Sequence, residues 1–187
     1  MAPRNAGFTL VELVMALAFF SFMMAILSIG VLQIMEIYQA GVSSRRTQQA
    51  ARVAMEDITR EVRAASRVEV DGPDHLCLEG ARPVDYQRIN DELIKKVGGA
   101  NCNDLSAATT TTLIGTSEAN NNLKLRQFDT NLIVSGSDDS SVDISLLVTT
   151  GADELLSGDG CIPGETGSQY CATTQFSSTV SLRGASG

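Results

Sequence analysis

The sequence predicts an α+β fold, in which one long N-terminal helix packs on an antiparallel β-sheet. Three observations lead to this fold class. An apolar run near the N-terminus is long enough for a membrane helix, a second helical pattern follows over residues 36–66, and short β-like segments occupy much of residues 67–187. A sheet with one apolar face needs a cover, and the amphipathic helical segment supplies it.

The apolar run extends from Phe8 to Leu32 and contains a single charged residue, Glu12. About 25 helical residues span roughly 37 Å, which is enough to cross the hydrocarbon core of a bilayer with some tilt. We therefore expect residues 8–35 to form a transmembrane helix. The run is too long for the apolar part of a secretory signal peptide. A carboxylate inside it is unfavourable by about 2.5–3.5 kcal/mol at the helix centre and by less near an end.

Residues 36–66 are predicted to continue as an amphipathic helix, because no proline interrupts the chain between Pro3 and Pro73. Small or apolar residues recur there every three or four positions. They form a stripe that consists of Ala40, Ser44, Thr47, Ala51, Met55, Ile58, Val62 and Ala65. We favour docking of this stripe on the sheet of its own domain over a contact between subunits. Residues 33–50 are expected to be exposed in the monomer and covered by neighbouring subunits.

The segments after residue 66 have the short patterns typical of strands. Candidate strands are residues 67–70, 76–79, 82–89, 92–97, 123–128, 131–136, 141–150 and 173–184. Residues 92–97 are also compatible with a helical turn. The short link Asp129–Thr130 predicts a hairpin between the two segments that flank it. Residues 98–122 and 151–172 are expected to be loops.

The net charge of −8 is unevenly distributed along the chain. Residues 1–70 carry seven arginines and six acids, whereas residues 71–187 carry 7 basic and 16 acidic residues. Binding to nucleic acid requires clustered Lys and Arg that neutralise phosphates. We therefore expect no nucleic-acid partner for the globular part.

Four cysteines, Cys77, Cys102, Cys161 and Cys171, follow the predicted membrane segment. None belongs to a C-x-x-C pair, and the single histidine, His75, cannot complete a Cys2His2 site, so a zinc site is disfavoured. An even number of cysteines beyond a membrane segment fits two disulfides in an oxidising compartment. Three pairings are possible, of which proximity in the sequence favours Cys77–Cys102 and Cys161–Cys171. The second pair would lie in a Gly-rich C-terminal loop.

Motifs of common enzyme classes are missing from the sequence. It contains no G-x-S-x-G nucleophile elbow, phosphate-binding loop or dinucleotide fingerprint, and His75 in GPDHL is expected to be a surface-loop histidine. Acidic residues cluster between positions 138 and 159, but their spacing does not match a calcium-binding EF-hand loop. We therefore expect a non-enzymatic protein without a metal ion or cofactor.

The heptapeptide GFTLVEL, from Gly7 to Leu13, resembles the processing motif of type IV pilins and the related pseudopilins. The motif is specific, because it places Gly, Phe, Thr, Leu and Glu at the head of a membrane-length apolar helix. The resemblance implies that residues 1–7 are a leader peptide, which a membrane prepilin peptidase removes by cleavage between Gly7 and Phe8. It also implies N-methylation of Phe8 and a pilin-like fold with a globular β-rich domain over residues 67–187.

The resemblance gives Glu12 a role in assembly. Glu12 would be the fifth residue of the mature chain, where the family keeps a Glu. An unpaired carboxylate in a medium of low dielectric tends to take up a proton, so an amine partner favours the charged form. We expect Glu12 to pair with the freed amine at Phe8 of a neighbouring subunit. The alternative is a Glu whose side chain reaches the membrane surface and has no partner.

Residues 56–68 and 173–184 resemble segments of PilW-type minor pilins and of the J-type pseudopilin of type II secretion. The resemblance implies a minor pilin that primes assembly of a type IV pilus or sits at its tip. The alternatives are a pseudopilin of a type II secretion or competence system, and a bitopic membrane-anchored extracytoplasmic binding domain that does not polymerise.

The same resemblance predicts where the protein resides and what it contacts. The expected location is the inner membrane, with the N-terminus cytoplasmic and the C-terminal domain periplasmic or extracellular, and later the pilus or pseudopilus. The expected partners are the prepilin peptidase, other pilins or pseudopilins, the inner-membrane assembly machinery and membrane lipid.

Overall fold

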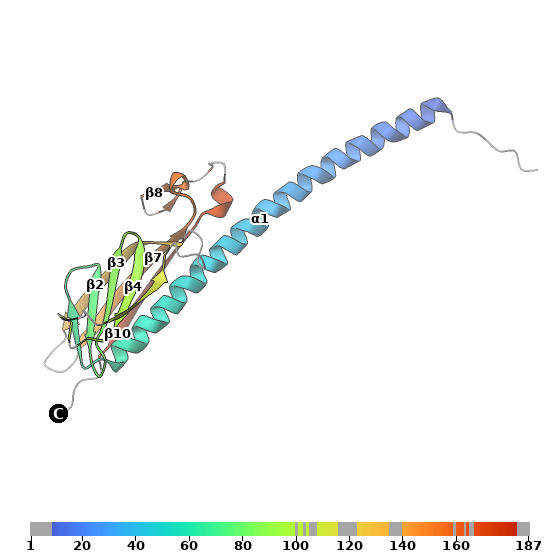
Figure 1. Ribbon diagram of the computed structural model, residues 1–187. Coiled ribbons are helices and arrows are strands. Elements are labelled where there is room, and N and C mark those ends of the chain that lie inside the picture. Colours follow the sequence, from blue (N-terminus) through green and yellow to red (C-terminus); the bar gives the residue numbers. More distant parts are fainter. Residues whose placement is uncertain are drawn as a thin grey trace, which may run out of the picture. The chain divides into compact units, whose positions relative to one another are not determined.

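The computed structural model confirms the α+β class, with one long N-terminal helix and antiparallel β-sheet (Figure 1). It describes residues 9–99, 101, 102, 104, 108–115, 123–134, 140–158, 160–162, 164 and 167–182. The chain divides into two compact units, Met1–Gln39 and Ala40–Gly187. Helix α1, Leu10–Ala64, contributes its first part to one unit and its remainder to the other.

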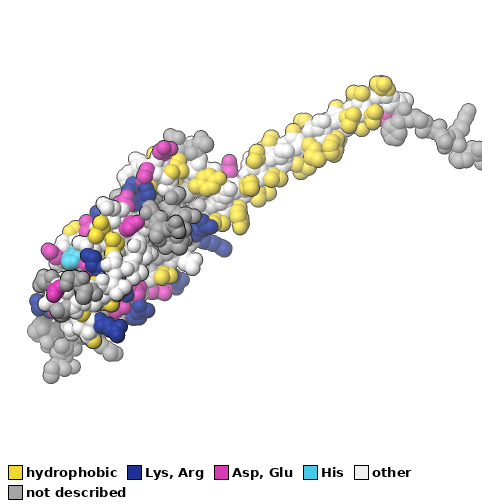
Figure 2. Space-filling model, in the orientation of Figure 1, with side chains coloured by type: hydrophobic (Ala, Val, Ile, Leu, Met, Phe, Trp, Pro, Cys, Tyr) yellow, Lys and Arg dark blue, Asp and Glu magenta, His cyan; other side chains and the backbone are white. Residues whose placement is uncertain are grey.

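The first part of α1 is apolar and exposed along its whole length. Its large hydrophobic side chains are roughly half exposed or more, from Leu10 at 78% to Ile37 at 74%. Figure 2 shows hydrophobic side chains projecting from the helix along this part of its length. Such a surface is unfavourable in water, so this part of the helix requires lipid or protein around it.

Five strands form the first sheet, and each pairs antiparallel with its neighbour in the chain. They are β1 (Arg67–Val70), β2 (His75–Glu79), β3 (Val84–Ile89), β4 (Glu92–Val97) and β5 (Thr109–Ile114). A two-residue turn joins β3 to β4, and its residues Asn90 and Asp91 both have positive φ, 51° and 63°. Asn and Asp tolerate this conformation, which matches the twist of a tight hairpin. Residues 92–97 are therefore a strand and not a helical turn.

A second sheet has the strand order β10-β7-β6 and is also antiparallel. Its strands are β6 (Leu123–Val134), β7 (Ser140–Thr150) and β10 (Ala172–Ser181). A small hairpin of β8 (Leu156–Ser157) and β9 (Gly160–Cys161) lies between β7 and β10 in the chain, with the short 3-10 helices η1 (Asp153–Leu155) and η2 (Ser168–Tyr170).

The C-terminal part of α1 and both sheets share one hydrophobic core. The stripe predicted from the sequence lies in this core, since Ala51, Ile58 and Val62 are fully buried there. Large side chains of the sheets complete it, with Phe128 from β6 and Tyr86 from β3 both at 0% exposure. The prediction that the stripe docks on the sheet of its own domain is therefore confirmed for this part of the helix.

Two predictions about the strands were wrong. Asp129 and Thr130 form no turn, because β6 runs through them and pairs them with Ser145 and Ile144 of β7. A twelve-residue strand results where a hairpin was expected, since pairing with a long neighbour outweighs the local turn preference of Asp. The Thr run at 109–112, expected to be a loop, belongs to β5, where its β-branched side chains suit an extended strand.

Candidate functional site

The helix start at Thr9 organises the predicted assembly site. The backbone N–H of Glu12 donates to Thr9 Oγ1 at 3.3 Å, and that of Leu13 donates to the Thr9 carbonyl at 3.2 Å. Thr9 is thus the N-cap, and Glu12 occupies the third helical position, as in the T-x-x-E capping-box pattern. A carboxylate there also interacts favourably with the helix dipole. The N-cap at Thr9 was not predicted from the sequence, although the spacing of Thr9 and Glu12 signals a helix start there.

Glu12 is the only charged residue between Leu10 and Met35. The most apolar stretch of this helix has a mean hydropathy of 2.4, and none of it is buried within the chain. The helix is therefore long and apolar enough to cross a membrane once. The predicted cleavage residues Gly7 and Phe8 lie outside the residues that the structure describes.

A second group of polar side chains joins α1 to the first sheet. Lys95 Nζ on β4 lies 2.7 Å from Asp57 Oδ2 and 3.1 Å from Glu61 Oε1, both on the helix. The Tyr86 hydroxyl donates to the same Asp57 oxygen at 2.7 Å. Arg60 pairs with Asp57 from the solvent side, where its own side chain is 70% exposed. We refer to these five residues as the helix–sheet cluster.

The helix–sheet cluster is largely shielded from water. The side chains of Lys95, Asp57 and Glu61 are 12%, 17% and 27% exposed. Burial raises the pKa of Tyr86, and its hydrogen bond to Asp57 raises it further, so the phenol stays protonated and donates. Because every charge here has an opposite partner, the cluster holds the helix in place and leaves no group free for chemistry. The cluster could not be predicted from the sequence, because Lys95 is 38 residues from Asp57.

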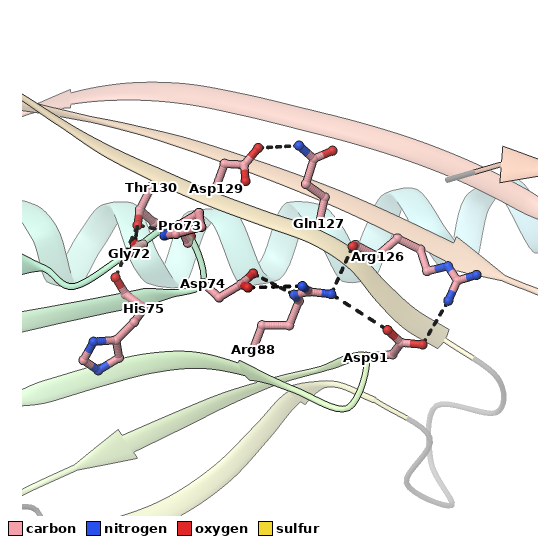
Figure 3. Close-up of polar contacts among 10 residues, drawn as sticks. All are labelled: Gly72, Pro73, Asp74, His75, Arg88, Asp91, Arg126, Gln127, Asp129 and Thr130. Carbon is pink, nitrogen blue, oxygen red and sulfur yellow. Dashed lines mark hydrogen bonds and ion pairs between the residues drawn. The ribbon is translucent and has the colours of Figure 1, made fainter. Parts of the chain in front are cut away.

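A third polar network links the β3–β4 turn to β6, as Figure 3 shows. Arg88 donates to both carboxylate oxygens of Asp74, at 2.7 and 3.2 Å, and this bond raises the pKa of Arg88. The β6–β7 ladder shifts register between Leu125 and Gln127, so Arg126 has no partner residue on β7. The bulge turns Arg126 towards Asp91, and Arg126 Nη1 donates to Asp91 Oδ2 at 3.0 Å. This network fixes the turn against the second sheet.

His75 was expected in a surface loop, and this was wrong. It is the first residue of β2, its side chain is only 25% exposed, and its Nε2 lies 2.6 Å from Oδ1 of the buried Asp85. Lys96 Nζ is 3.9 Å from the other oxygen of Asp85. The described surroundings of His75 include no nucleophile within hydrogen-bond reach, so the pair does not have the geometry of a catalytic dyad.

The four cysteines lie in two pairs, the two that proximity in the sequence favours. Cys77 is bonded to Cys102 and Cys161 to Cys171, each with a Cα–Cα distance of 5.9 Å. The first bridge ties the buried strand β2 to the segment after β4, and the second closes the loop between β9 and β10. Both distances are normal for disulfides.

One group of three potential metal ligands occurs among the described residues, Glu69, Glu79 and Cys102. The Cys102 sulfur is already bonded to Cys77, which leaves two carboxylates, one of them near Arg67. Of the clustered acids, Asp143 accepts a hydrogen bond from Thr179, and Asp153 pairs with Lys124, which lowers the pKa of Asp153.

Comparisons with protein-family models, curated proteins and solved structures found no match to this chain.

Proposed function

We propose that the protein is a minor pilin, a non-enzymatic subunit that primes assembly of a type IV pilus or sits at its tip. The observation that carries this proposal is the combination of GFTLVEL with an exposed apolar helix that contains one charge, Glu12. None of the most apolar stretch of this helix is buried within the chain. It therefore needs lipid to cover it before assembly and other helices to cover it after assembly. The single carboxylate then has a partner only if another subunit brings one.

In this proposal a prepilin peptidase cleaves between Gly7 and Phe8, and Phe8 becomes the methylated N-terminus. Residues 8–35 hold the subunit in the inner membrane until the assembly machinery transfers it to the filament. There, Glu12 pairs with the amine at Phe8 of a neighbouring subunit. The desolvated pair is more favourable than either charge alone, because an isolated carboxylate in hydrocarbon is driven to its neutral form.

The position of Glu12 in the first turn of the helix gives a way to separate charge pairing from helix formation. Glu12→Gln keeps a side chain that is accepted at the third position of a capping box but removes the charge, whereas Glu12→Ala removes both. If charge pairing drives assembly, both variants are cleaved normally and both are largely absent from filaments sheared from the host cells. Incorporation of Glu12→Gln at the wild-type level refutes the pairing, and a defect in Glu12→Ala alone assigns Glu12 to the helix start.

The mass of the N-terminal peptide from the purified protein tests the class itself. A methylated Phe8 supports a pilin or a pseudopilin. An intact Met1, in cells with an active prepilin peptidase, supports instead the bitopic anchored domain that does not polymerise. Deletion of the gene distinguishes a type IV pilus from a type II secretion or competence pseudopilus. Loss of piliation would support the pilus, and loss of secretion would support the type II secretion pseudopilus.

A further inference from the structure

Among the residues that the structure describes, strand β10 pairs with β7 alone and so forms an open edge of the second sheet. It is 10 residues long, its sequence ATTQFSSTVS contains no charge and no proline, and its pairing with β7 runs from Ala172 to Ser181 without a register shift. A long, straight, uncharged edge strand offers a row of backbone donors and acceptors to any extended segment. Proteins usually protect such edges.

The other edge strands of the two larger sheets, β1, β5 and β6, are protected. β1 has only 4 residues and carries Arg67 and Glu69. β6 carries charged side chains and is bulged at Arg126. The ladder that ends in β5 is interrupted by a register shift beside Leu93. Short length, charge and bulges are the features that block addition of another strand, and β10 has none of them.

The ladder pattern shows which backbone groups of β10 are free. The N–H of Leu182, just after the strand, donates to the Ser140 carbonyl at 2.8 Å. Because hydrogen-bonded pairs alternate in an antiparallel ladder, even-numbered residues of β10 face β7 and odd-numbered ones face the open edge. Gln175, Ser177 and Thr179 therefore direct their N–H and C=O groups away from β7.

A groove of about 560 Å³ lies between this strand and helix α1. Its strand side is formed by Phe176, Ser177 and Ser178, and its helix side carries three arginines and one glutamate. The helix side consists of Arg52, Met55, Glu56, Thr59, Arg60 and Arg63. Arg52 pairs with Glu56 and Arg60 with Asp57, whereas the exposed Arg63 has no ion-pair partner among the residues that the structure describes. The groove thus has an excess of positive charge.

We propose that β10 is a docking site for an extended acidic segment of a partner protein, which adds to the second sheet as a further antiparallel or parallel strand. Backbone groups of Gln175, Ser177 and Thr179 supply the hydrogen bonds. Side chains of an added strand alternate between the two faces, so every second one points to the helix side, where Arg63 favours a carboxylate. This inference concerns only the globular part and does not depend on the proposed function.

The test measures binding of a fluorescein-labelled peptide of about seven residues, in which Glu alternates with Val, to the full chain in zwitterionic lipid nanodiscs. Fluorescence anisotropy should report saturable binding that weakens with added salt. Ser177→Pro removes one N–H from the open edge and leaves the ladder to β7 intact, and it should weaken binding at least about tenfold. Arg63→Glu should weaken it about three- to tenfold, and the matched control Arg82→Glu, outside the groove, by less than about twofold.

Two peptide controls keep the test independent of any folding defect in Ser177→Pro. A peptide with Lys in place of Glu, and a peptide methylated on alternate backbone nitrogens, should both fail to bind. The proposal is overturned if either control peptide binds as tightly as the Glu-containing peptide. Tight binding of the Lys peptide would show that charge does not select the partner, and tight binding of the methylated peptide would show that no backbone ladder forms. The proposal is also overturned if the chain binds no peptide but self-associates, and if Ser177→Pro abolishes that self-association. The edge would then be assigned to a second copy of the chain.

Discussion

Replacing Lys95 by Met tests how strongly the helix–sheet cluster holds α1 on the first sheet. Met keeps most of the aliphatic stem and removes only the ammonium group. The change eliminates the contacts of 2.7 Å to Asp57 and 3.1 Å to Glu61, and it leaves the two carboxylates facing each other in a shielded site. The folded state therefore loses attraction and gains repulsion.

The magnitude follows from the burial of the three groups. Breaking a fully buried pair costs about 3–5 kcal/mol, and an exposed pair contributes only about 0.2–1 kcal/mol. Lys95 is 12% exposed, while Asp57 keeps its bonds to Tyr86 and Arg60, so an intermediate loss of about 2 kcal/mol is expected. For a chain of this size, that loss lowers the Tm by about 4–8 °C.

The assay is thermal unfolding of the full chain in detergent, followed by the β-sheet signal in far-ultraviolet circular dichroism. Lys124→Met is a matched control, because Lys124 is 14% exposed but its partner Asp153 is 78% exposed. Because solvent screens that pair, Lys124→Met should lower the Tm much less than Lys95→Met does. The double variant Lys95→Met, Asp57→Asn should recover part of the loss, since one of the repelling charges is gone.

Equal and small losses of Tm in Lys95→Met and Lys124→Met would show that the helix–sheet cluster does not hold α1 in place. Losses that simply add in the double variant would show that the carboxylate of Asp57 does not interact with Lys95.

Two further predictions concern pH and the disulfides. Burial and the bond to Asp57 raise the pKa of Tyr86 above its usual 10.0, so the unfolded chain ionises first and stability falls as the pH rises through about 10. Tyr86→Phe should lower the free energy of unfolding by about 1–2 kcal/mol at neutral pH. In urea titrations, its free energy of unfolding should decline less steeply between about pH 9 and 11 than that of the wild type, and parallel pH curves would contradict this. The Cys77–Cys102 bridge joins residues 25 apart and is expected to contribute about 3.5 kcal/mol, whereas the Cys161–Cys171 bridge joins residues 10 apart and is expected to contribute about 2.7 kcal/mol. Replacing both cysteines of the first bridge by Ala should therefore lower the urea midpoint more than the same change in the second bridge. The opposite order would show that the loop-closure argument does not hold here.

Features that depend on neighbours in the sequence could be predicted without the structure. The apolar run and the stripe with Ile58 and Val62 define α1, because burial on a helix repeats every three to four residues. Strands such as β7 were found from their β-branched residues. The cysteine pairs that are close in sequence are the bonded ones. The T-x-x-E spacing could also have predicted the N-cap at Thr9.

Features that depend on distant residues were decided only by the tertiary structure. No local pattern places Lys95 beside Asp57, aims the bulged Arg126 at Asp91, or carries β6 through Asp129 without a turn. The open edge of β10 is likewise defined by which strands pair with which. Helix formation is governed by hydrogen bonds and burial within a few residues, whereas strand pairing and ion pairing join segments tens of residues apart, and only the complete fold selects those partners.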